Sequence, residues 1–157
     1  MELVREAKTL VEQFLDVGIP EIPVYVTTEE GLKRELAKLY MKRGYSKEDA
    51  EEIAARNVRF LRALYLREEG MILLKEGSGE NLQTLVHEFL HIVQKCDGSP
   101  LRREKIVIFL TYRMLQDKFE HDLLTRAVVE EWEAKERSVG LERIKQRLLE
   151  EGDCNDL

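Results

Sequence analysis

Two histidines and a glutamate lie close together in the run His87-Glu88-Phe89-Leu90-His91, and these residue types at this spacing can bind and use a metal ion. In a helix, residues four apart lie only about 40° apart around the axis, so both imidazoles can face one ion. Glu88 falls on the adjacent edge of that face, where its carboxylate can reach a water held by the metal. Two of the three histidines in the chain are in this run.

The residues around this motif predict a helix that draws the histidines toward the interior. Apolar side chains recur there at helical spacing, at Leu82, Leu85, Val86, Phe89, Leu90, Ile92 and Val93. The same residues could arise by chance on a solvated helix, which would leave a structural histidine pair without an ion. The apolar setting favours a metal site over that alternative.

Length and composition predict one domain spanning residues 1–157. The chain is 43% hydrophobic without a break in composition, and it is long enough to bury a core unaided. Its net charge is −6, and the 25 basic residues are interspersed among 31 acidic ones, so no nucleic-acid partner is expected. Charged residues make up 36% of the chain, a balance that leans toward a thermophilic source.

The charged N-terminus and the shortness of the apolar stretches predict a cytoplasmic protein. The N-terminus is charged from its second residue, and the longest purely apolar stretch covers only residues 106–110, so neither a signal peptide nor a membrane span is predicted. Cys96 and Cys154 are far apart and have no metal-ligand spacing. A single disulfide between them is left open.

The pattern of apolar residues predicts an α+β fold that is predominantly helical, with a small sheet ahead of the motif helix and a helical C-terminal half. Helices are expected over 2–16, from a Thr27 cap to 44 and from a Ser46 cap to about 67, with short strands at 23–27 and 70–77. Thr27 with Glu30, and Ser46 with Asp49, supply the capping signals.

Clear start and stop signals frame the motif helix. Residues 78–81 provide a turn and an N-cap, and residues 96–100 end the helix. Everything from Leu101 onward is expected to be helical, with breaks near 116–122 and at Gly140.

A catalytic zinc takes three protein ligands and keeps a fourth position open for water, so one further donor is required. The candidates are Asp97, the cluster Glu120-His121-Asp122, the pair Glu130 and Glu131, and Glu133. A carboxylate on a buried helix face needs a partner, and a metal ion can be that partner.

Helical phase favours Glu131 as the third ligand, with Glu130 as the reserve. An apolar arc is formed by Leu123, Leu124, Ala127, Val128 and Trp132, and Glu131 falls inside it. The alternative for Glu131 is a salt bridge with Arg126 or Lys135.

His121 and Tyr112 are further candidates for the catalytic machinery. A three-histidine site is disfavoured, because the extended motif has glycine where this chain has Gln94, and His121 is too far along the chain from His91. His121 or Tyr112 could still stabilise an oxyanion if its helix packs over the cleft. An ordinary surface or core role is the simpler interpretation of each.

The motif with Gln94 after it, the short strand ahead of it and the acidic run Glu131-Trp132-Glu133-Ala134 resemble the gluzincins, the glutamate-type branch of the zincin metallopeptidases. The nearest likeness is to the small single-domain archaeal members, the minigluzincins, and it covers residues 70–137. Gluzincins often carry an acidic or amide residue four positions after the ligand glutamate, where this chain has Lys135.

The resemblance implies a single zincin-like domain that binds one zinc ion through His87, His91 and Glu131. Glu88 would act as general base and then as acid, and residues 71–76 would form the cleft-edge strand that pairs with an extended substrate. The expected activity is hydrolysis of peptide or protein substrates by a metal-activated water, without a membrane partner.

A second hypothesis is a catalytically silent or latent metal-binding protein. Residues 150–157 form an acidic tail, from which Cys154 or a carboxylate could occupy the open zinc position. A flexible polar terminus is the simpler interpretation of that tail. A third hypothesis is a protease that cleaves one specific protein and leaves generic substrates intact.

Overall fold

The structure, a computed structural model, describes residues 2–77 and 81–157. Most of the predicted turn at 78–81 therefore lies outside the described residues. The chain divides into two compact units, here named the helical unit (Met1–Ile19 with Leu85–Leu157) and the sheet unit (Pro20–Thr84). The sequence predicts one domain, because its composition does not change at these boundaries. The contacts in the structure instead divide the chain into two units.

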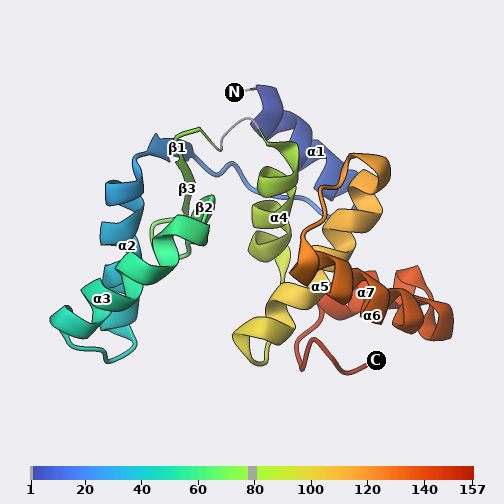
Figure 1. Ribbon diagram of the computed structural model, residues 1–157. Coiled ribbons are helices and arrows are strands. Elements are labelled where there is room, and N and C mark those ends of the chain that lie inside the picture. The colour runs from blue at the N-terminus through green and yellow to red at the C-terminus, as the bar shows by residue number, and fades with distance from the viewer. Residues whose placement is uncertain (1, 78–80) are drawn as a thin grey trace. The chain divides into compact units, whose positions relative to one another are not determined.

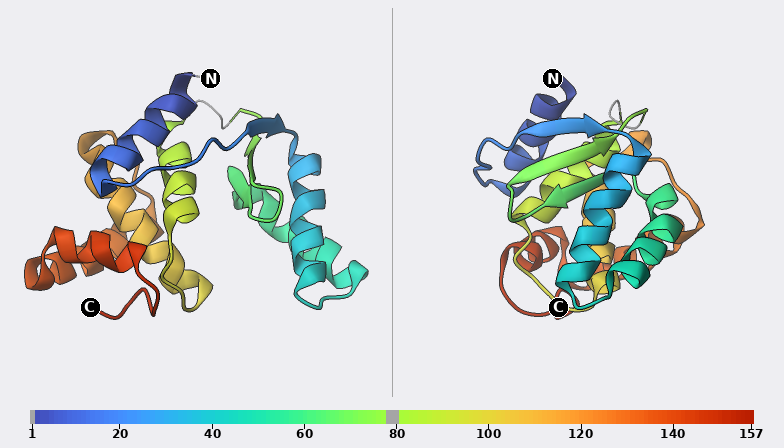
Figure 2. Two further views of the ribbon diagram at one scale, coloured as in Figure 1. Left: turned by 180° about the vertical axis from the view of Figure 1, so that it is seen from behind. Right: turned by 90° about the vertical axis from the view of Figure 1, so that its left-hand side faces the viewer.

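The sheet unit contains a small sheet and two helices (Figures 1 and 2). Its elements are β1 (Val24–Thr27), α2 (Glu29–Lys42), α3 (Lys47–Asn57), η1 (Val58–Phe60), β2 (Ala63–Leu66) and β3 (Met71–Lys75). The strand order is β1-β3-β2, with β1 parallel and β2 antiparallel to β3. Leu32 of α2 packs in one core cluster with Leu66 and Leu73 of the sheet.

β3 is the central strand of this sheet, which corrects the resemblance-based placement of residues 71–76 at the edge of a cleft. Val24 of β1 pairs with Ile72, and Ala63 of β2 pairs with Leu74, so both sides of β3 already have partners. A strand with two neighbours has no backbone edge left to pair with a substrate.

β2 explains why the third helix is shorter than expected. The helix that begins after Ser46 ends at Asn57, and residues 63–66 form a strand. Such a short apolar stretch fits the helical period as well as a strand, so periodicity alone extends the helix. Gly70, with φ of +65°, lies in the turn that leads from β2 into β3.

The caps agree with the sequence at one helix and differ by one residue at another. Ser46 Oγ accepts a hydrogen bond from the Asp49 backbone N–H at 3.1 Å, as predicted. At α2, Thr28 rather than Thr27 is the N-cap, and its hydroxyl accepts from the Gly31 N–H. Thr27 is instead the last residue of β1.

The helical unit carries the motif and most of the C-terminal half (Figure 1). Its helices are α1 (Glu2–Leu15), the main part of α4 (Leu82–Val93), α5 (Pro100–Leu115), η2 (Gln116–Lys118), α6 (Leu123–Val139) and α7 (Leu141–Leu149). Asn81 caps α4, since its side-chain oxygen accepts from the N–H groups of Gln83 and Thr84. The expected breaks between α5 and α6 and at Gly140 are confirmed.

The α+β, predominantly helical fold with a small sheet ahead of the motif helix is therefore confirmed. Across residues 2–77 and 81–157, no helix has both the length and the apolar composition needed to cross a membrane.

The C-terminal segment 150–157 is anchored, which corrects the prediction of a flexible tail. Cys154 forms a disulfide with Cys96, so the bridge that the sequence left open is present. The Asp97 N–H donates to the Gly152 carbonyl at 2.8 Å, and the Cys154 N–H donates to the Asp97 carbonyl at 2.9 Å. Because its sulfur is bonded to Cys96, Cys154 is unable to occupy a zinc position.

Leucine truncations test the core of the helical unit. Leu90 on α4 is fully buried, whereas Leu123 at the start of α6 is 86% exposed. We expect Leu90→Ala to lower the free energy of unfolding by about 2–5 kcal/mol and Leu123→Ala to change it by less than about 0.5 kcal/mol. Urea unfolding followed by the fluorescence of Trp132, the single tryptophan, measures both. Equal losses would contradict this description of the core.

Candidate metal centre

α4 presents His87 and His91 on one side while its other side is buried. Leu85, Val86 and Phe89 are in the core, and the two imidazoles are only 25% and 15% exposed. Their Nε2 atoms are 3.2 Å apart. The pairing expected from the i, i+4 spacing is thus present in the structure.

Glu104 on α5 joins this pair and completes a group of three possible ligands. Its Oε2 lies 2.9 Å from His87 Nε2, and its Oε1 lies 2.8 Å from His91 Nε2. All three donor atoms lie within 4.8 Å of one another. Ser99, whose hydroxyl accepts from the Arg102 N–H, caps α5 just ahead of Glu104.

The separations within this group fit one tetrahedral ion. Ligands at about 2.0–2.1 Å from a tetrahedral zinc lie about 3.3 Å from one another. The observed separations of 2.8–3.2 Å, of which the two shortest involve different oxygens of Glu104, are within about half an ångström of that value. Two imidazoles and one carboxylate also form a donor set that catalytic zinc uses, with a fourth position left for water.

The electrostatics of the group are those of a tight ion pair. Burial alone would lower the pKa of His87, but the hydrogen bond and the charge of Glu104 outweigh burial and raise that pKa. Burial would raise the pKa of Glu104, but hydrogen bonds to both histidines hold that pKa far below its usual range. A bound cation would therefore take the place of a proton.

Glu88 lies close enough to this group to interact with all three charges without being one of the ligands. Burial raises the pKa of the Glu88 carboxyl, the histidine charges oppose that rise, and the charge of Glu104 adds to it. A carboxyl with a raised pKa is better matched to accepting and returning a proton near neutral pH.

Gln94, just beyond the end of α4, fixes the orientation of His91. It is buried, with 6% of its surface exposed, and its Oε1 lies 2.8 Å from His91 Nδ1. Its Nε2 donates to the Arg103 carbonyl at 3.0 Å, which identifies the amide oxygen as the atom facing His91. His91 Nδ1 therefore carries a proton, and Nε2 is the ring nitrogen that faces Glu104 and His87.

The structure does not bring Glu131, the predicted third ligand, to the histidine pair. Its carboxylate contacts Lys105 Nζ at 3.2–3.3 Å and is 45% exposed. The buried side of α6 is formed by Val128, Val129 and Trp132, whereas Leu123 and Leu124 are exposed. Those two leucines shift the predicted apolar arc toward Glu131.

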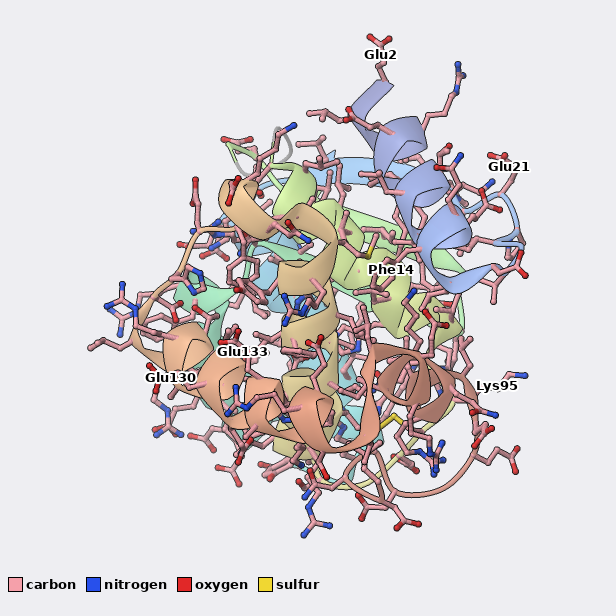
Figure 3. All side chains as sticks on the ribbon, turned by 90° about the vertical axis from the view of Figure 1, so that its right-hand side faces the viewer. Glu2, Phe14, Glu21, Lys95, Glu130 and Glu133 are labelled. Carbon is pink, nitrogen blue, oxygen red and sulfur yellow. A yellow bond between two sulfur atoms is a disulfide. The ribbon has the colours of Figure 1, made fainter. Side chains whose placement is uncertain are left out.

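The neighbouring acids on α6 are also away from the histidines. Glu130, the reserve ligand, is exposed on α6, and Glu133 lies 3.9 Å from Arg113 of α5 (Figure 3). Asp97 is an exposed loop residue, 3.8 Å from Arg103 Nε. Glu104, and none of these carboxylates chosen from the sequence, joins the histidines in the group that could hold a metal ion.

Tyr112 and His121, the predicted oxyanion residues, lie together in another place. Their rings are 5.5 Å apart, both contact the ring of Phe119, and all three line a cavity of about 350 Å³. Tyr112 is eight residues beyond Glu104, which places it about 12 Å farther along α5. The structure does not bring either residue to the group of His87, His91 and Glu104 that could hold a metal ion.

Sequence reasoning missed Glu104, although the helical-phase argument could have found it. The residues three, four and seven positions later, Val107, Ile108 and Thr111, are all buried, so Glu104 continues the buried face of α5. The position four residues after Glu104 is apolar. In this chain Gln94 contacts and orients His91, whereas gluzincins often orient a metal histidine with a polar residue four positions after the ligand glutamate.

Comparisons with known proteins add no relative to this description. No family model, no curated protein and no solved structure matches the chain.

Paired glutamate variants test which carboxylate is a ligand. We expect Glu104→Gln to lose most of the bound zinc, because a neutral amide is a poor replacement for a charged oxygen ligand. Glu131→Gln should keep one zinc per chain, since the Glu131 carboxylate pairs with Lys105 and is not part of the histidine group. Elemental analysis after dialysis measures both variants, and zinc loss in Glu131→Gln alone would contradict the assignment.

The metal-free protein should show a pH dependence that the Glu104 ion pair explains. The lowered pKa of Glu104 contributes stability above about pH 4.3, its unfolded value, which is lost as the pH falls. The raised pKa of His87 contributes stability below about pH 6.5, which is lost as the pH rises. We expect the contribution of the pair to be largest between those values in chelator-treated protein.

Urea unfolding at about pH 3.5, 5.5 and 8 measures this dependence, and Glu104→Gln should flatten it. With zinc present the alkaline side should reverse, because the ion replaces the protons and binds more tightly as the pH rises. An identical profile in Glu104→Gln would show that the pair contributes nothing.

Proposed function

We propose that this protein is a zinc-dependent hydrolase of peptide bonds with a zincin-like architecture. The observation that carries the proposal is the convergence of His87, His91 and Glu104 at separations suited to one tetrahedral ion, with Glu88 beside them on the same helix. The two-histidine, one-glutamate donor set is the one that the resemblance to gluzincins implies, with Glu104 taking the place of Glu131.

The donor count and the exposure of the group favour a catalytic site over a structural one. Structural zinc sites are closed by four protein ligands, whereas catalytic sites have three and an open position. Within the described parts of the chain, the group holds three such residues, each partly accessible to solvent. A partly accessible site with three donors leaves room for water and for a substrate carbonyl.

The residues of the chain divide the chemistry between them. A zinc ion held by His87, His91 and Glu104 would polarise the scissile carbonyl and lower the pKa of its water toward about 7. Glu88 takes the proton from the attacking water and then passes it to the leaving amine. The raised pKa of Glu88 helps it to retain that proton between the two steps.

A metal-binding protein without turnover is the second candidate. It is favoured by the ion pair itself, since Glu104 and the two histidines satisfy one another without an ion. Such a group could serve to hold the fold together or to store a metal. Cys154 plays no part in this candidate, because its sulfur is bonded to Cys96 and so is unable to fill the open metal position.

Glu88→Gln separates the two candidates. The zinc-loaded variant should keep one zinc per chain and lose at least about 100-fold of the hydrolysis rate, because the amide cannot accept the proton. His91→Ala should lose both zinc and activity. Cleavage of a proteome-derived peptide mixture, read by mass spectrometry, gives the rates, with Glu131→Gln as the matched control.

Hydrolysis at the wild-type rate in Glu88→Gln would contradict the assigned role. A wild-type protein that binds zinc and cleaves no peptide in the mixture would favour the second candidate.

A further inference from the structure

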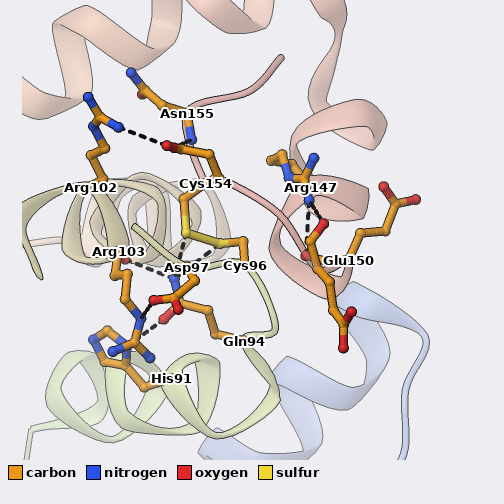
Figure 4. Close-up of a disulfide and its surroundings, with 12 residues drawn as sticks. His91, Gln94, Cys96, Asp97, Arg102, Arg103, Arg147, Glu150, Cys154 and Asn155 are labelled. Atoms are coloured by element: carbon orange, nitrogen blue, oxygen red, sulfur yellow. Dashed lines mark hydrogen bonds and ion pairs between the residues drawn. A yellow bond between two sulfur atoms is a disulfide. The ribbon is translucent and has the colours of Figure 1, made fainter. Parts of the chain in front are cut away.

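A disulfide lies next to the metal centre in the helical unit. Cys96, in the loop after α4, is bonded to Cys154 in the C-terminal segment (Figure 4). The two residues are 2% and 0% exposed, so the bridge is part of the core. It joins positions 58 residues apart in the sequence.

Gln94 contacts both the disulfide and a metal-binding histidine. Its Nε2 lies 3.4 Å from the sulfur of Cys96 and 3.4 Å from that of Cys154. Its Oε1 lies 2.8 Å from His91 Nδ1, and Figure 4 shows these groups side by side. One buried amide therefore touches the bridge at one end and the imidazole at the other.

The disulfide limits where this amide can lie. The sulfurs form part of the wall around the Gln94 side chain, and the Arg103 carbonyl accepts a hydrogen bond from the same nitrogen. Without the covalent bond, Cys154 would be held by its backbone contacts with the Asp97 loop and by the nearby Arg102–Asp153 ion pair. That pair is exposed, and exposed pairs are worth little.

We infer that Gln94 is a positioning residue for His91 and that formation of the Cys96–Cys154 disulfide is the oxidative step that completes the metal centre. This inference rests on the proposed zinc site and adds its maturation. Partners that orient a metal-binding histidine change metal affinity by about 10–100-fold. The chain without the disulfide should bind zinc more weakly by a factor in that range.

The oxidation is an exchange with a second disulfide. The two cysteine thiols give two electrons and two protons to an oxidised dithiol partner, which leaves as two thiols, and the Cys96–Cys154 bond forms. Because both sulfurs are buried once bonded, attack by a reducing thiolate is hindered. The step is thus a maturation of the site and not a rapidly reversible switch.

Zinc affinity, measured by competition with a chromogenic chelator, tests the inference on the full chain. We expect the double variant Cys96→Ser with Cys154→Ser to bind zinc at least about 10-fold more weakly than the oxidised wild type. Serine avoids free thiols that would bind zinc themselves. Gln94→Met, which keeps the disulfide and loses the acceptor for His91, should weaken binding similarly.

Combining the three substitutions tests whether the coupling passes through Gln94. If it does, the triple variant binds zinc no more weakly than Gln94→Met, because the two effects act through one contact. Arg102→Ala is the matched control. It removes the ion pair with Asp153 in the same segment, does not touch Gln94, and should leave zinc affinity unchanged.

A second readout separates positioning from general stability. Nitrogen-15 NMR of the imidazoles should find the His91 proton on Nδ1 in the wild type and lose that preference in Gln94→Met. Gln94→Glu retains the acceptor oxygen and should restore zinc affinity to within a few-fold of wild type. A purely structural role for Gln94 predicts no such rescue.

The outcomes distinguish this inference from the proposed function. Unchanged zinc affinity in Gln94→Met would overturn the inference even if the serine variant does not fold, while the zinc site would stand. Equal affinity in the oxidised wild type and a folded serine variant would overturn the role of the disulfide. Absence of zinc from every form, the wild type included, would overturn the zinc site and the inference together.

Discussion

The bridge from Glu104 to both histidines is the interaction on which the helical unit's chemistry depends. One carboxylate on α5 meets two imidazoles on α4, at 2.8 and 2.9 Å. Each of these groups is partly buried beside core residues of its helix, where leaving a polar group unpaired is unfavourable. Pairing them across the two helices removes that cost and holds the donors where one ion can bind.

The elements that sequence reasoning predicted best are those with strong local signals. The Ser46 cap and the break at Gly140 need only neighbouring residues, and both are found where expected. β2 was missed, because four residues of apolar sequence satisfy either period and its partner strand is distant in the chain. The central position of β3 in the sheet could not be predicted for the same reason, since β3 is central only because β2 pairs with it.

In the candidate site too, the part that depends on neighbouring residues was predicted and the part that depends on another helix was not. His87 and His91 are four residues apart on one helix, so the sequence alone brings them together. The third donor comes from another helix, and the choice of Glu131 used two leucines that the structure leaves exposed at the start of α6. Glu104 lies in phase with buried residues of its own helix, which the same argument could have used.

The metal-free ion pair and the proposed zinc site use nearly the same positions of the same atoms. An ion bound at this group would displace the protons that Glu104 shares with the two imidazoles, with little movement of side chains. Gln94 accepts a hydrogen bond from His91 Nδ1, so the ring already directs Nε2 toward the site before an ion arrives. Such preorganisation lowers the entropy lost when an ion binds. Because the ion and the protons use the same nitrogen and oxygen atoms, protons compete with the ion at acidic pH.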